Sequence, residues 1–407
     1  MCPRNIITSR LCRALHNNSH RYSTLSQPQT PTTSAVKRFW TSLYAPMESY
    51  RPKPRTPKQD AETAARKLAA MHKRKTAAIA AAAKASTHII DKFRFDFSFA
   101  SHVHHGSKHT PLISSLTDLT DFEFSAVPRV PRRRVAGNVD TISVRSGDDA
   151  LIASPYLLGI ADGVSSWGAN SDAGVWSRLI LENMSRNVMQ FKLNITDKTK
   201  TTHVPSYHFQ EQEVLRCLDH SFVQTLETMD TDAIEGSSTV LISLILGNKL
   251  KIISIGDSKV YVIRKGALIE TNEEQMQSGL CPQQIGTNHT DVLPSLVTWM
   301  DSVELQADDI VIVCSDGLSD NMWQDELVEC VNKKLAEMER DGEEDMQKLA
   351  NYLLYRSKDV AFDNFAVCPY TEKVNNLSLT QRCLDGLAVG GKVDDISICV
   401  ARVVENY

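Results

Sequence analysis

The segment STVLISLILGNKLKIISIGDSKVYVIRKGALIET, residues 238–271, alternates strand-length apolar runs with tight turn signals. Turns of two residues that contain glycine favour antiparallel hairpins. The predicted strands are 238–246, 249–255, 258–264 and 267–271, joined at Gly247-Asn248, Gly256-Asp257 and Lys265-Gly266. This segment predicts an antiparallel sheet rather than a sheet of parallel strands with crossover helices.

The rest of the chain surrounds this segment with further strand patterns and with helical patterns. A strand-like alternation starts at Phe93, and other predicted strands are 141–145, 150–154, 157–161, 296–303, 309–315 and 395–404. Helices are predicted at 172–191, 208–230, 323–339 and 343–359. Short hairpins separated by paired helices predict an α+β fold, with antiparallel sheets and helices packed outside them. Segment 112–136 is predicted to be an exposed stretch that leads into the main domain. Segments 192–206 and 368–386 are predicted to be polar insertions.

The amino-acid composition argues against several classes of protein. The chain has 407 residues, of which 42% are hydrophobic and 23% charged, as in ordinary globular proteins. No apolar run approaches the roughly 20 residues that span a bilayer, so no membrane span is predicted. Its nine cysteines are scattered without a CxxC pair, which argues against a disulfide framework and a structural zinc site. Cys314 and Cys399 lie within apolar strands and are predicted to be core residues.

The N-terminal 47 residues differ in charge from the rest. They contain six basic residues and no acidic one, and they are rich in Ser, Thr and Asn. This composition predicts a mitochondrial transit peptide and a matrix location, and the alternative is a disordered basic tail that binds acidic partners. Residues 48–90 are predicted to be a linker with an Ala/Lys-rich helix, and 91–407 the main domain. The residues after the leader include 39 basic and 49 acidic ones. This net negative charge argues against a nucleic-acid partner.

Four acidic segments stand where predicted strands run into loops. They are Gly147-Asp148-Asp149-Ala150, Ala161-Asp162-Gly163, Ser315-Asp316-Gly317 and Val393-Asp394-Asp395-Ile396. Carboxylates gathered at one end of a sheet are suitable ligands for hard divalent cations. A single Asp-Gly pair is more often a turn than a ligand. Four such segments together predict a metal-dependent hydrolase.

Six motifs in order resemble the metal-dependent type 2C protein phosphatases over roughly residues 90–404. They are Gly147-Asp-Asp-Ala, Gly159-Ile-Ala-Asp-Gly-Val, Gly236-Ser-Ser-Thr-Val, Ile255-Gly-Asp-Ser-Lys-Val, Cys314-Ser-Asp-Gly-Leu-Ser-Asp and Gly391-Lys-Val-Asp-Asp-Ile-Ser. The resemblance implies a four-layer αββα sandwich, with two packed antiparallel β-sheets flanked by helices. With its mitochondrial-type leader, the chain looks most like the mitochondrial T-cell-activation branch of that family.

The resemblance also implies a site with two Mn²⁺ or Mg²⁺ ions. Asp162 resembles the carboxylate that bridges both ions, and the backbone carbonyl of Gly163 a ligand of the first. Asp316 and Asp394 resemble the ligands of the second ion. Gly163 and Gly317 are expected to let the backbone turn tightly behind each ligand.

Several neighbouring positions carry further expectations. Asp148 and Asp149 match an acidic pair that holds metal-bound water or a weaker third ion. Arg145 matches a phosphate-binding arginine, shifted by one residue, and an exposed strand end is the equally weighted alternative. Val164 stands directly after the Asp-Gly pair, where many members of that family have a histidine that is proposed to act as general acid. Asp395 replaces the usual asparagine, which should alter the hydrogen bonds around the ligands.

Three further polar features are predicted to be structural. Asp257 is expected in a hairpin turn, and Asp320 as the cap of a helix that begins near Trp323. Four histidines without a thiolate partner are predicted to form a surface loop rather than a metal site. They are His102, His104, His105 and His109.

The predicted function is that of a monomeric serine/threonine phosphatase. It would hydrolyse phosphoserine and phosphothreonine on mitochondrial phosphoproteins with water activated by the two ions. The alternative is a catalytically weak or inactive regulatory or binding module with the same fold, suggested by Val164 and the spacing of Arg145. A third hypothesis, with less support, is a different two-metal hydrolase that acts on a small phosphate ester.

Overall fold

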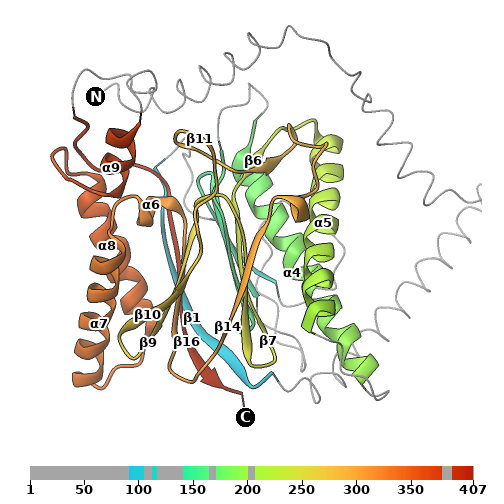
Figure 1. The fold of residues 1–407 in the computed structure, drawn as a ribbon, viewed down its shortest axis with the longest axis horizontal. Helices are drawn as coiled ribbons and strands as arrows, with labels where there is room; N and C mark the ends of the chain where they lie inside the picture. The colour runs from blue at the N-terminus through green and yellow to red at the C-terminus, as the bar shows by residue number, and fades with distance from the viewer. Residues whose placement is uncertain are drawn as a thin grey trace, which may run out of the picture.

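Two antiparallel β-sheets are stacked between two layers of helices (Figure 1). The structure is a computed structural model that describes residues 91–104, 112–116, 141–164, 171–199, 207–377 and 387–406. The leader 1–47, the whole of the segment 48–90, His105 and His109 lie outside the described residues. The predicted αββα sandwich is therefore confirmed for the described residues.

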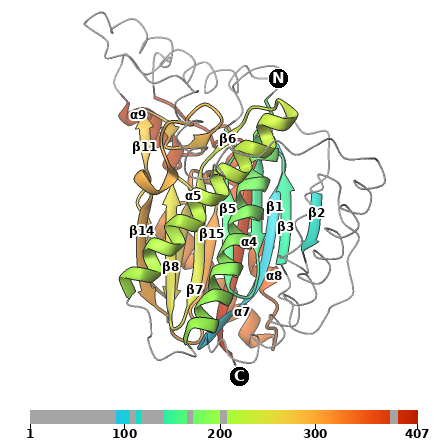
Figure 2. The same ribbon diagram turned by 90° about the vertical axis from the view of Figure 1, so that its right-hand side faces the viewer.

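The larger sheet has seven strands in the order β14-β8-β7-β5-β4-β3-β2. Their bounds are Trp299–Glu304, Lys249–Ile255, Val240–Leu246, Leu157–Ala161, Asp149–Ala153, Thr141–Ser146 and Leu112–Leu116. All neighbouring pairs are antiparallel. Figure 2 shows this sheet behind two long helices, α4 (Ala173–Thr199) and α5 (Tyr207–Asp232).

The smaller sheet has five strands in the order β1-β16-β15-β9-β10, also antiparallel. Their bounds are Phe93–His102, Ile396–Glu405, Ile310–Cys314, Lys259–Arg264 and Ala267–Thr271. Helices α7 (Gln324–Arg340) and α8 (Met346–Ala361) cover its outer face. Short pieces complete the fold: β6 (Ser237–Ser238), β11 (Met276–Ser278), β12 (Cys281–Pro282), β13 (Ile285–Gly286), η1 (Pro294–Leu296), α6 (Asp316–Ser319) and α9 (Pro369–Asn376).

Three apolar layers hold these four layers together. Side chains such as Leu158, Ile252 and Val313 fill the space between the two sheets, and all three are fully buried. Trp176 of α4 packs edge-on against Phe222 of α5, with ring centroids 5.8 Å apart. The predicted core positions Cys314 and Cys399 are fully buried. Burial on this scale is the main stabilising contribution in a domain of this size.

The predicted hairpin at Gly256-Asp257 is wrong. Strand β8 pairs with β7 and β14, whereas β9 pairs with β15 and β10, so the chain crosses from one sheet to the other at this step. Gly256 adopts φ 105°, which a residue with a side chain rarely adopts. The other two predicted turns do join paired strands, β7 with β8 and β9 with β10.

Three local predictions also need correction. The segment 112–136 contains a strand, β2, which pairs with β3. Helix α4 continues to Thr199, through half of the predicted insertion 192–206. Helix α9 begins at Pro369 in the second predicted insertion, where proline suits the first helical turn. Among the helices that the structure describes, none has both the length and the hydropathy of a membrane-spanning segment.

Candidate metal centre

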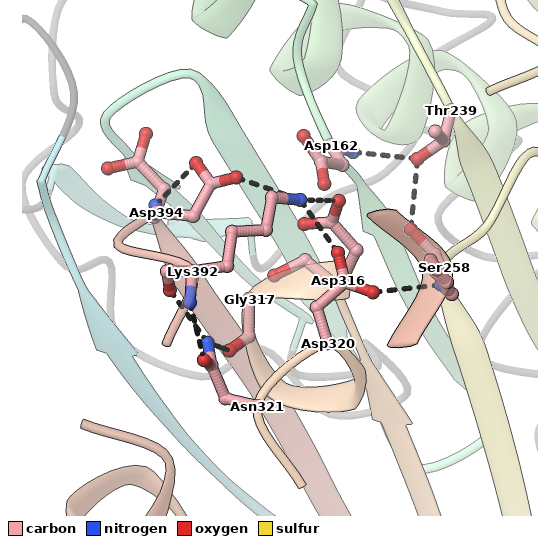
Figure 3. A network of polar contacts seen from close by, with 12 residues as sticks. Asp162, Thr239, Ser258, Asp316, Gly317, Asp320, Asn321, Lys392 and Asp394 are labelled. Carbon is pink, nitrogen blue, oxygen red and sulfur yellow. Dashed lines mark hydrogen bonds and ion pairs between the residues drawn. The ribbon is translucent and has the colours of Figure 1, made fainter. Parts of the chain in front are cut away.

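The acidic segments of the two sheets meet at one end of the sandwich. Asp149 begins β4 and Asp162 follows β5, so both come from the seven-stranded sheet. Asp316 follows β15 and Asp394 precedes β16, so both come from the five-stranded sheet. Figure 3 shows Asp162, Asp316 and Asp394 facing one shared region. The stacking of the sheets therefore gathers carboxylates that lie far apart in the sequence.

Their mutual repulsion is evident in their pKa values. Burial first, and then the charges of Asp316, Asp149 and Asp394, raises the pKa of Asp162 well above its usual range. Burial and the neighbouring Asp395 and Asp394 do the same for Asp149. Burial raises the pKa of Asp316 to about 6, although Lys392 opposes the shift. Like charges held this close favour either protonation or a bound cation.

At this end of the sandwich, three buried carboxylates have an oxygen without a hydrogen-bond partner in the described part of the molecule. The atoms are Asp149 Oδ2, Asp257 Oδ1 and Asp316 Oδ1. A buried polar atom without a partner costs free energy unless something else satisfies it. Several carboxylate oxygens with negative charge are the donors that Mn²⁺ and Mg²⁺ take. The residues present therefore fit divalent cations.

A lysine that the sequence analysis did not single out lies among these carboxylates. The Lys392 ammonium forms ion pairs with Asp316, with Asp320 at 2.9 Å and with Asp394 at 3.1 Å (Figure 3). Asn321 fixes the lysine backbone, because its amide donates to Lys392 O and accepts from Lys392 N. In the described ranges, no three Asp, Glu, His or Cys side chains converge on a ready metal position. The ammonium group of Lys392 instead lies between Asp316 and Asp394.

Asp257 and Asp320 also belong to this cluster, against the sequence prediction. Asp257 is 4% exposed, and burial followed by the charge of Asp316 raises its pKa. Asp320 does not cap α7, whose N-cap residue is Trp323. Its carboxylate instead pairs with Lys373 and Lys392, which outweigh the effect of burial and lower its pKa. The sequence did contain a signal for the role of Asp320. In the Cys314–Asp320 motif, Asp320 follows Asp316 by four residues, which is about one helical turn.

The Asp395 carboxylate holds the loop that carries Asp148. It accepts the backbone N–H of Asp148 at 2.9 Å and that of His104 at 2.5 Å. Gly147 adopts φ 72°, and a Cβ there would lie 2.2 Å from Asp395 Oδ2. Asp395 is thus a positioning group that ties three chain segments together. The predicted histidine loop contributes a backbone group to this contact, and the rings of His102 and His104 lie edge-on to Phe362.

Arg145 is held by an ion pair in this structure. Its Nη2 contacts Asp172 at 2.6 Å, and its Nε donates to Gly147 O at 3.2 Å. Asp172 also accepts the backbone N–H of Val175 in the first turn of α4. Arg145 therefore joins the acidic loop to the start of α4, and its contact with a phosphate remains a prediction.

The predicted reason for the glycines of the two Asp-Gly pairs is wrong. Neither Gly163 nor Gly317 adopts a positive φ. A Cβ on Gly163 would lie 2.2 Å from Asp148 O, and one on Gly317 would lie 2.1 Å from Asp395 O. Each glycine therefore allows two acidic loops to approach closely, rather than allowing a tight turn.

The Gly-Ser-Ser-Thr and Gly-Asp-Ser motifs position the backbone of Asp162. Thr239 Oγ1 accepts the Asp162 N–H at 3.0 Å, and the Thr239 N–H donates to Asp162 O at 2.9 Å. Thr239 Oγ1 also shares a hydrogen bond with Ser258 Oγ at 2.9 Å. The two motifs thus fix the strand end that presents this carboxylate.

Comparison with known proteins shows which family the chain resembles. Residues 140–354 match the family model described as "Protein phosphatase 2C". A probable protein phosphatase 2C 26 from Arabidopsis thaliana is 26% identical over 271 residues, covering 64% of this chain and 80% of the relative. The protein phosphatase PTC7 homolog fig from Drosophila willistoni is 28% identical, covering 64% and 78%. The catalytic domain of the phosphatase PstP, solved in complex with two manganese ions, is 16% identical with a TM-score of 0.45, covering 77% and 99%.

Proposed function

Because the chain belongs to the protein phosphatase 2C family, we propose that it hydrolyses phosphoserine and phosphothreonine in proteins with two Mn²⁺ or Mg²⁺ ions. The observation that supports this most is the convergence of Asp162, Asp316 and Asp394 from two sheets. The buried oxygens without partners at Asp149 and Asp316 add to it. We propose that the enzyme acts as a monomer on phosphoprotein substrates.

In this proposal the residues have unequal roles. Asp162 would hold both ions and the carbonyl of Gly163 would bind the first, while Asp316 and Asp394 would hold the second. When bound, the ions supply Lewis-acid chemistry that activates water and neutralises phosphate charge. Val164 has no proton to donate to the leaving alkoxide, so the chain offers no general acid at that position.

The carboxylates around the shared region contribute in two ways. Asp149 is 1% exposed, so its negative charge acts through a medium of low dielectric and strengthens cation binding. Asp148 and Asp149 together are proposed to hold metal-bound water or a weaker third ion. Asp395 keeps the Asp148 backbone in place through its hydrogen bond. Arg145 is proposed to bind the phosphate, for which its guanidinium would leave Asp172.

Phosphate release from a phosphothreonine peptide tests this proposal directly. We expect release by the purified chain with Mn²⁺ or Mg²⁺, and none above background with EDTA. Peptide that remains intact under every metal condition, with a folded protein, would instead support the regulatory alternative. Metal-independent release would argue against the two-ion site.

We further propose that the enzyme acts in the mitochondrial matrix. The support is the charge of residues 1–47, with six basic residues and no acidic one. A fluorescent reporter fused behind residues 1–47 is expected in mitochondria. A matched fusion with Arg4→Gln, Arg10→Gln and Arg13→Gln is expected to stay in the cytosol. The same cytosolic distribution for both fusions would remove the basis for mitochondrial substrates.

A further inference from the structure

Lys392 lies where the proposed ligands of the second ion meet. Its ammonium pairs with Asp316 and Asp394, and both belong to that ligand set. The lysine side chain is only 16% exposed. Tyr370 lies beside it, with the ammonium 6.0 Å from the ring centroid. The lysine is therefore an internal part of the centre and not a surface charge.

An ammonium group and a divalent ion cannot occupy the space between the same two carboxylates. Both are compact cations that take carboxylate oxygens as partners. The lysine backbone is anchored by Asn321, but its four-carbon stem leaves the ammonium free to move once its carboxylates find another cation. Ion binding and the observed ion pairs of Lys392 are therefore alternatives.

We infer that Lys392 is a tethered cation that closes the metal centre in the metal-free protein and must be displaced when the second ion binds. The inference rests on the proposed function, because it takes Asp316 and Asp394 as ligands of that ion. Two consequences follow. The lysine balances the negative charge of the metal-free centre, because its ammonium pairs with Asp316, Asp320 and Asp394. It also weakens the apparent metal affinity, because only the displaced state binds the ion.

Calorimetric titration of Mn²⁺ into EDTA-treated protein measures this competition without any substrate. We expect Lys392→Met to bind Mn²⁺ at least about tenfold more tightly than the natural chain, because the competing state is removed. Its melting temperature without metal should fall, because three carboxylates lose their shared partner. Lys392→Arg keeps a competing charge and should bind Mn²⁺ within about threefold of the natural chain.

Lys373→Met is the matched control. Lys373 pairs with Asp320 and Glu274 and makes no ion pair with the proposed ligands of the second ion. Its removal deletes one positive charge near the centre without opening the space between Asp316 and Asp394. We expect a smaller affinity gain than for Lys392→Met. Equal gains would show a general charge effect and overturn the inference, as would an unchanged or weaker affinity of Lys392→Met.

A second measurement uses the natural chain, so it does not depend on how well a variant folds. Acetylation by an N-hydroxysuccinimide ester, followed by peptide mass spectrometry, reports how accessible each lysine is. We expect Mn²⁺ to raise acetylation of Lys392 severalfold, while exposed Lys265 serves as the internal reference. Equal or lower acetylation of Lys392 with Mn²⁺ would contradict displacement.

If neither the natural chain nor Lys392→Met binds Mn²⁺, the ligand set of the proposed function fails as well. Binding that is lost in Asp316→Ala but unaffected by Lys392→Met would overturn the lysine inference alone.

Discussion

Asp316→Ala is expected to lower the kcat/KM of Mn²⁺-dependent phosphate release by more than about a hundredfold, because even residues that only support a ligand cost up to that much. Asp316 is 7% exposed, and its Oδ1 has no hydrogen-bond partner in the described residues. In the proposed ligand set Asp162 and Asp394 would already hold the ions, so alanine would leave one ligand position empty. Alanine would also leave Lys392 paired with Asp320 and Asp394, which further disfavours metal binding. Steady-state kinetics over a range of Mn²⁺ concentrations measures the effect.

Asp301→Ala provides the control for this prediction. Asp301 lies on β14, its side chain is exposed, and its carboxylate accepts a local hydrogen bond from Ser302 N. Its loss should leave kcat/KM within about twofold of the natural chain, as is usual for surface substitutions. A folded Asp316→Ala protein with kcat/KM within tenfold of the natural chain would show that the chemistry does not use this carboxylate.

Gly317→Ala is expected to damage both the fold and the centre. Its Cβ would lie 2.1 Å from Asp395 O and 3.0 Å from Ile396 Cγ1, and the first is a backbone atom that cannot rotate away. Overpacking of this kind costs about 1–3 kcal/mol of the free energy of unfolding. Relief of the clash would push the Asp394-Asp395 segment away from Asp316. A shift of about 1 Å between groups that act together can cost on the order of a hundredfold in rate.

Urea denaturation and phosphatase kinetics on the same preparation measure the two effects of Gly317→Ala. Gly342→Ala is the control, because Gly342 adopts φ 66° and a Cβ there would have no atom within 4 Å. That variant carries backbone strain of roughly 1 kcal/mol but no clash, so its activity should be unchanged. Natural activity in Gly317→Ala would mean that the two acidic loops separate without consequence, which would exclude the close approach as a requirement of the site.

The amino-acid sequence determined the elements and the proposed ligands. Apolar alternation depends on neighbours two to four residues away, so strands such as Leu157–Ala161 and Lys249–Ile255 followed from local pattern alone. The acids at strand ends were also visible as a series. Their order along the chain pointed to the family, and the match of residues 140–354 confirmed it.

Only the tertiary structure decided which elements pair and which charges meet. The strands on both sides of Gly256-Asp257, KLKIISI and KVYVIR, are similar mixtures of apolar and charged residues, so their pattern does not show that they enter different sheets. Lys392 stands 76 residues after Asp316, and Asp395 stands 247 residues after Asp148. Contacts over such separations arise when apolar layers stack the two sheets, and local sequence carries no record of them. The sequence thus determined a set of candidate acidic ligands, and only the tertiary structure showed a lysine among them.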